Sequence, residues 1–88
     1  MGHSEAYERM LRAARSGQAD ALYNLGIAYA AGENGLPIDL IAAHKWFNLA
    51  ARAGDDRAPE DRAELAAEMS AWEIAEAQKQ ARAWLAAN

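Results

Sequence analysis

The residues that come first into question for acid–base, nucleophilic or metal chemistry are His44, the scattered serines and the carboxylates at positions 55, 56, 60 and 61. His44 has no second histidine near it, which gives a metal site little support, so we expect a partly exposed packing residue. No serine lies on the strained turn of a nucleophile elbow, and the carboxylates suit the positive N-terminus of a helix. We therefore expect no catalytic residue, no metal site and no cofactor.

Composition and charge disfavour several further classes of protein. The 88 residues suit one small domain. The formal net charge is −4 and the nine basic residues are dispersed, whereas a nucleic-acid groove needs a basic stripe. The absence of cysteine excludes a disulfide framework and a thiolate nucleophile. No apolar run is long enough to span a membrane, and no secretory signal is visible at the start. We expect a cytoplasmic protein that binds neither nucleic acid nor membrane.

The remaining candidates for a functional role are side chains that could contact a partner. Tyr29, Trp46 and Phe47 could form an aromatic ligand box. All three fall on helical stripes that must face each other, however, so we assign them to the core. Tyr23 and Ile27 lie opposite such a stripe on their helix. Two interpretations stay open for these two residues: they pack against a later helix, or they line a binding groove.

Three more residues complete the candidate set. Asn24 and Ala31 flank the face of Tyr23 and Ile27, and a short amide such as that of Asn24 pairs well with a peptide backbone. Trp72 lies off the apolar stripe of its own helix. Its side chain either folds back onto the preceding helix or is exposed as an anchor for a partner or a second copy. The predicted partner-binding residues are Tyr23, Asn24, Ile27, Ala31 and Trp72.

Start signals, stop signals and apolar periodicity predict five helices that position these side chains. They cover residues 5–15, 19–31, 40–52, about 56–69, and a fifth segment that ends near residue 87. Ser4 and Asp39 are the expected N-caps of the first and third helices, and Ser70 with Glu73 has the form of a capping box before the fifth. Valine and threonine are absent, which argues against a sheet. The predicted fold class is therefore all-α.

The sequence also contains an internal repeat. Residues 50–54 echo residues 13–17, so the first helix corresponds to the second half of an earlier repeat. We divide the single domain, 1–88, into that half repeat at 5–17, a complete repeat at 18–54, and terminal capping helices at 55–88. Gly26 lies in the middle of its helix, where glycine costs about 1 kcal/mol relative to alanine. We expect Gly26 to permit close approach of a facing helix through the small residues Ala43 and Ala50.

The complete repeat resembles the Sel1-like repeats, which are relatives of the tetratricopeptide repeats. The motif joins a Leu-Gly pair and a Tyr to a loop with Gly, Pro and Asp. An Ala, an aromatic residue and an Ala-Ala pair then precede a closing Gly. The matching residues are Leu25, Gly26, Tyr29, Gly32, Gly35, Pro37, Asp39, Ala43, Trp46, Ala50, Ala51 and Gly54. The segments 43–51 and 74–78 are also similar to the last repeat and closing helices of bacterial members.

This resemblance implies an antiparallel α-hairpin solenoid of about five helices, and an adaptor role without chemistry of its own. We therefore expect a non-catalytic protein–protein interaction module that binds an unknown protein or peptide partner on its concave helical face. The alternative is a self-assembling structural module, a homodimer through exposed solenoid ends. That alternative arises because the first helix lacks the half repeat that would cover its outer side.

Overall fold

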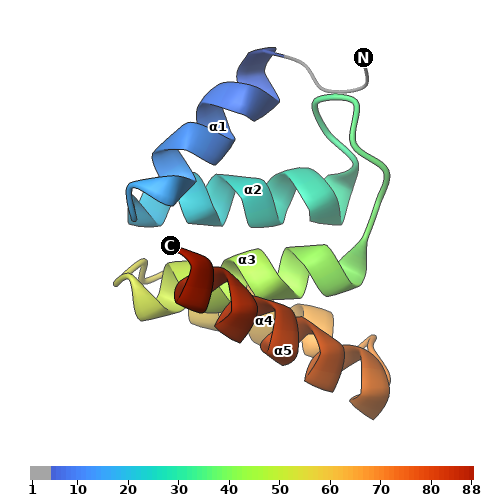
Figure 1. Cartoon of the computed structure of the whole chain (residues 1–88). Helices are drawn as coiled ribbons and strands as arrows, with labels where there is room; N and C mark the ends of the chain where they lie inside the picture. The colour runs from blue at the N-terminus through green and yellow to red at the C-terminus, as the bar shows by residue number, and fades with distance from the viewer. Residues whose placement is uncertain (1–4) are drawn as a thin grey trace.

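The computed structural model describes residues 5–88, and in this part of the chain α-helices are joined by turns and loops, with no strand (Figure 1). Five helices follow one another along it: α1 (Glu5–Arg15), α2 (Ala19–Ala31), α3 (Leu40–Arg52), α4 (Ala58–Ala66) and α5 (Ala71–Ala87). The predicted all-α class is confirmed for the described residues. The expected N-cap at Ser4 lies outside them.

The first three helices have the bounds that their start and stop signals predict. α3 begins after Asp39, whose carboxylate accepts a hydrogen bond from the backbone N–H of Ala42 at 3.0 Å. α2 ends at Gly32, which has a left-handed conformation (φ 73°) and donates its N–H to the carbonyl of Ala28. Glycine adopts this conformation without the steric cost that a Cβ adds. Local backbone chemistry therefore sets both ends of the loop that joins α2 to α3.

α4 is shorter than the segment 56–69 that the sequence predicts. Before the helix, the Asp55 carboxylate accepts the backbone N–H of Arg57 at 2.9 Å and pairs with the Arg57 guanidinium at 2.6 Å. After the helix, Glu68 and Met69 donate their N–H groups to carbonyls three residues earlier, at 2.9 and 3.1 Å. Such three-residue turns take the place of the α-helical pattern. Side-chain pairing at one end and tightened turns at the other thus limit α4 to Ala58–Ala66.

α5 begins at the predicted capping box. Ser70 Oγ accepts the backbone N–H of Glu73 at 3.1 Å, and the Glu73 carboxylate accepts the backbone N–H of Ser70 at 2.8 Å. This exchange satisfies two donors that the first helical turn would otherwise leave free. Further along α5, the indole of Trp84 meets that of Trp46 edge-on, with 4.8 Å between ring centroids. That contact fastens the C-terminal part of α5 to α3.

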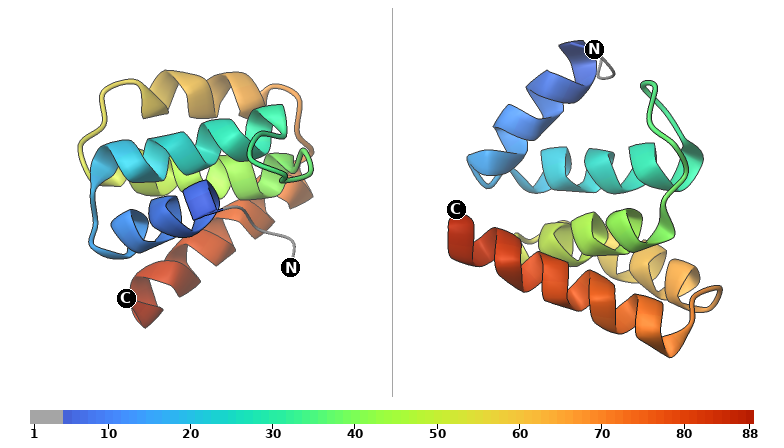
Figure 2. Two further views of the ribbon diagram at one scale, coloured as in Figure 1. Left: turned by 90° about the horizontal axis from the view of Figure 1, so that it is seen from above. Right: turned by 45° about the vertical axis from the view of Figure 1, so that its right-hand side comes forward.

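α3 is the central helix of the fold. It lies against α2 on one side and against α4 and α5 on the other, while α1 packs on α2 (Figure 1, Figure 2). α2 and α3 run antiparallel and form one α-hairpin. α4 and α5 each pack on α3 more closely than on each other. The structure therefore shows one α-hairpin with further helices around it, and it does not confirm the repeated hairpin stacking of a solenoid.

The core lies mainly between α2 and α3. Its largest buried side chains are Tyr7, Leu22, Leu25, Leu36, Trp46, Phe47 and Leu49. The assignment of Trp46 and Phe47 to the core is confirmed, since both are almost fully buried. Tyr29 is half-buried and packs at the edge of this cluster. Its hydroxyl lies 3.2 Å from the hydroxyl of Tyr7, which links α2 to α1.

Gly26 permits a close approach, as its place in α2 predicts, but the facing group is not the expected one. A Cβ built on Gly26 would lie 2.4 Å from Cδ1 and 2.5 Å from Cε1 of Phe47. The ring of Phe47, rather than Ala43 or Ala50, therefore fills the space beside the glycine backbone. The expectation was wrong because Phe47 lies on the same stripe of α3 as the alanines, and the register of the hairpin places the largest of the three opposite Gly26.

Candidate functional site

A groove lies between α2 and α4, on the face of α2 that carries Tyr23 and Ile27. It encloses about 350 Å³. Residues of α2, α3 and α4 and of the turn after α4 line it: Tyr23, Ile27, Ala30, Phe47, Asp61, Glu64, Leu65 and Glu68. We refer to it as the α2–α4 groove. Two of the five predicted partner-binding residues, Tyr23 and Ile27, are thus brought together with side chains that come much later in the chain.

Tyr23 forms one wall of the groove and connects α2 to α4. Its ring lies 5.4 Å from the ring of Phe47, centroid to centroid, and the guanidinium carbon of Arg57 lies 3.9 Å from its centroid. Its hydroxyl donates a hydrogen bond to Asp61 Oδ2 at 2.5 Å. This bond to a carboxylate, followed by burial, raises the pKa of Tyr23, so the phenol stays protonated as a donor. The packing interpretation of Tyr23 is confirmed, and the same side chain lines the groove.

The accessible edge of the groove is acidic. Glu64 and Glu68 are exposed and stand four residues apart, which places them on the same side of the α4 segment. Among the described residues that line the groove, none is Lys, Arg or His. Ile27 and Leu65 are half-buried between the two helices. The groove therefore combines apolar surface with two exposed carboxylates, a chemistry that suits cationic, partly apolar ligands.

The other three predicted residues lie outside the groove. Asn24 and Ala31 are exposed on α2, and Ala30 rather than Ala31 belongs to the lining. Trp72 lies near the start of α5 and is 68 % exposed. Its side chain therefore does not fold back into the core, and the alternative of an exposed indole is the one that the structure shows. The predicted set is divided between the groove, the outer side of α2 and the beginning of α5.

The sequence interpretation missed the contribution of α4 to this site. Asp61, Glu64, Leu65 and Glu68 recur at the i, i+3, i+4, i+7 spacing of one helical face. That spacing is the signal that identifies them, because it marks one face of α4 as both acidic and apolar. From the sequence alone, the carboxylates of this region are interpreted only as charges near a helix N-terminus. That interpretation does not predict that they lie beside Tyr23.

His44 is buried, and not partly exposed as the sequence predicts. Only 3 % of its surface is accessible, because α3 is covered by α4 and α5 as well as by α2. Its Nδ1 is buried without a hydrogen-bond partner. Burial, and secondly the charge of Arg62, lowers the pKa of His44, so the imidazole is neutral at pH 7. Within residues 5–88, no group of three or more His, Asp or Glu side chains is placed to hold a metal ion.

Among the described residues, no helix is both long and apolar enough to cross a membrane. Comparisons of the chain with models of known protein families, with curated proteins and with solved structures find no match. The resemblance to Sel1-like repeats therefore depends on the motif residues of segment 18–54, and the candidate site depends on the geometry of the α2–α4 groove.

Proposed function

We propose that this chain is a non-catalytic binding module of the Sel1-like type, which holds a basic segment of a partner protein in the α2–α4 groove. The observation that carries the proposal is the presence, in a single groove, of apolar side chains beside exposed carboxylates. The motif residues of segment 18–54 support the Sel1-like assignment. An adaptor of this kind needs a shaped surface and no reactive group.

The groove offers two kinds of contact to such a segment. Ile27 and Leu65 present half-buried apolar surface, and a partner side chain seated there would leave water. Glu64 and Glu68 present acceptors for a lysine ammonium or an arginine guanidinium, and such charge-assisted bonds are stronger than neutral ones. A partner segment that matches the groove carries an apolar side chain and, near it, cationic side chains one helical turn apart. An amphipathic helix that binds in a groove has this arrangement.

The wall of the groove is ordered before any partner binds. The Tyr23 ring contacts Phe47 and Arg57, and its hydroxyl is bound to Asp61. Side chains that are already fixed lose little conformational entropy on binding, which favours affinity. Because the Asp61 carboxylate is engaged by Tyr23, we assign recognition of the cations to Glu64 and Glu68.

Selection of peptides from a displayed random library tests this proposal. Peptides that bind the wild-type protein should be enriched in Lys or Arg near an apolar residue. The variant Glu64→Lys/Glu68→Lys should bind those peptides at least tenfold more weakly, because a lost charge-assisted hydrogen bond costs about 1.5–3 kcal/mol and a tenfold change in Kd is about 1.4 kcal/mol.

The matched control is Glu8→Lys/Glu33→Lys, which makes the same change in net charge at two exposed positions outside the groove. It should bind the selected peptides as the wild type does. If both double variants lose binding equally, the peptides respond to net charge alone and the groove is not the site. A selection without enrichment of basic residues also contradicts the proposal.

A further inference from the structure

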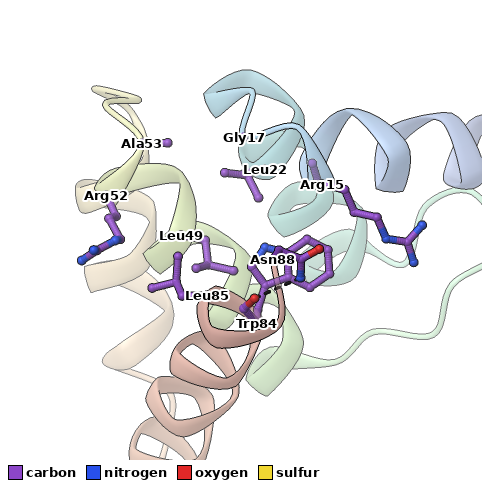
Figure 3. A pocket seen from close by; sticks show the side chains of 10 residues that line it. Arg15, Gly17, Leu22, Leu49, Arg52, Ala53, Trp84, Leu85 and Asn88 are labelled. Atoms are coloured by element: carbon purple, nitrogen blue, oxygen red, sulfur yellow. Dashed lines mark hydrogen bonds between the residues drawn. The ribbon is translucent and has the colours of Figure 1, made fainter.

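A second pocket lies where the C-terminal ends of α3 and α5 approach the turn between α1 and α2 (Figure 3). It encloses about 230 Å³. Figure 3 shows the side chains of Leu22, Leu49, Trp84 and Leu85 grouped around it, with those of Arg15 and Arg52 extending outward on opposite sides. We refer to it as the arginine pocket. Its inner surface is apolar, and its edge is cationic.

The charge around this pocket is opposite to that of the whole chain. Leu49, Arg52 and Leu85 also line an adjoining hollow, to which Arg82 contributes. Among the described residues that line either cavity, none is Asp or Glu. Three arginines without an Asp or Glu side chain among the lining residues make the local potential positive, although the formal net charge of the chain is −4. The occupant that matches this chemistry is an apolar side chain with a carboxylate near it.

Trp72 is a side chain of that kind on the same molecule. It lies near the start of α5 and is the most exposed of the large apolar side chains described. Glu76 follows one helical turn later on the same face of α5. Trp72 is thus an exposed indole with a carboxylate one helical turn away.

Trp72 cannot reach the arginine pocket of its own chain. Leu85 lines that pocket and belongs to the same helix as Trp72. Thirteen residues separate the two positions, and a rise of 1.5 Å per residue puts them about 20 Å apart along a rigid helix. Any contact between the indole and the pocket must therefore join two copies of the chain.

We propose that the chain associates head to tail, with Trp72 of one copy inserted in the arginine pocket of the next. A cavity of about 150 Å³ is enough to hold a benzene ring, so a pocket of about 230 Å³ has room for one aromatic side chain. Glu76, which does not line the α2–α4 groove, then approaches Arg15 or Arg52. This interface is heterologous and builds rings or open chains. It gives the self-assembling alternative a definite contact, which differs from a twofold dimer through solenoid ends.

The association uses none of the residues that line the α2–α4 groove, so either site can exist without the other. An interface anchored by one side chain is small, and small interfaces are typical of weak, transient complexes. The measurement must therefore extend from micromolar to millimolar protein.

Sedimentation velocity over that concentration range, with two variants and their mixture, tests the proposal. Trp72→Ala removes the inserted side chain, and Leu85→Glu places a carboxylate in the pocket at a position that is already 43 % exposed. The wild-type protein should show an average mass that rises beyond a dimer with concentration, and each variant alone should remain a monomer. An equimolar mixture should form dimers and nothing larger. The Leu85→Glu copy still has its indole and the Trp72→Ala copy still has its pocket, so each pair can form one contact and no further copy can be added.

The matched control is Ile38→Glu, the same kind of substitution at an apolar side chain that is 66 % exposed and outside both cavities. It should associate as the wild type does. A wild-type protein that is monomeric at every concentration overturns the proposal, and so does a mixture of the two variants that stays monomeric. A wild-type dimer that does not grow further would show a twofold interface and would overturn it as well.

Discussion

At the residue scale, replacement of Gly26 by alanine has two opposing effects on the free energy of unfolding. The sign of the measured change therefore shows which effect is larger. Alanine is favoured over glycine inside a helix by about 1 kcal/mol, but its Cβ would lie 2.4 Å from the Phe47 ring. Overpacking of this kind costs about 1–3 kcal/mol. We expect Gly26→Ala to lower the free energy of unfolding, measured by urea denaturation, and Gly26→Leu to lower it further.

A double-mutant cycle provides the control for that prediction. In a Phe47→Leu background the ring is absent, so the cost of Gly26→Ala should shrink or change sign, and the coupling energy between the two positions should be clearly different from zero. A Gly26→Ala variant that is more stable than the wild type would show that the glycine does not serve the contact with Phe47.

His44 should make stability depend on pH. Burial lowers its pKa in the folded state, whereas in the unfolded chain a histidine has a pKa of about 6.5. Below about pH 6.5 the unfolded state therefore binds more protons than the folded state, and stability falls as the pH falls. We expect the Tm to decrease from pH 7 to pH 5, and His44→Leu to remove much of that decrease.

The carboxylates act in a different range of pH. Hydrogen bonds from Arg57 lower the pKa of Asp55 below its ordinary value of 3.8. Its contribution to stability is therefore present above about pH 4 and is lost only as the pH falls further. Thermal melts at pH 7, 6 and 5 thus separate the two groups. If His44→Leu kept the full pH dependence of the wild type, the buried imidazole would not be its source.

At the scale of the helix, Asp39 fixes the start of α3 through its bond to the N–H of Ala42. Replacement of an N-cap by alanine costs about 1 kcal/mol, and asparagine caps as well as aspartate does. We expect Asp39→Ala to lower the free energy of unfolding by about that amount and Asp39→Asn to leave it nearly unchanged. Equal losses in the two variants would indicate that the charge of Asp39, and not its hydrogen bond, stabilises the helix.

The features that the sequence predicts well are those that local chemistry decides. Asp39, Gly32 and the pair Ser70 and Glu73 set helix ends through contacts within a few residues, and the structure has these ends where they are predicted. The features that it misses depend on contacts between distant helices. The burial of His44 follows from how α4 and α5 lie on α3, and the spacing on α4 marks one face of that helix but does not indicate that this face lies opposite Tyr23.

At the scale of the molecule, α3 separates two surfaces of opposite charge. The α2–α4 groove has Glu64 and Glu68 at its edge, and the arginine pocket has Arg15 and Arg52. Association through the pocket would leave the groove of each copy accessible, so several copies would present several identical grooves. Linked binding sites raise the overall affinity for a partner that carries repeated basic segments.

The most direct test of the proposed groove is an NMR titration of the wild-type protein with one of the selected basic peptides. The backbone amides of residues 23–30 and 61–68 should shift, while the indole N–H signals of Trp72 and Trp84, which lie outside the groove, should not. Shifts concentrated at Trp84 and in α1, with the amides of the groove unchanged, would contradict partner binding between α2 and α4.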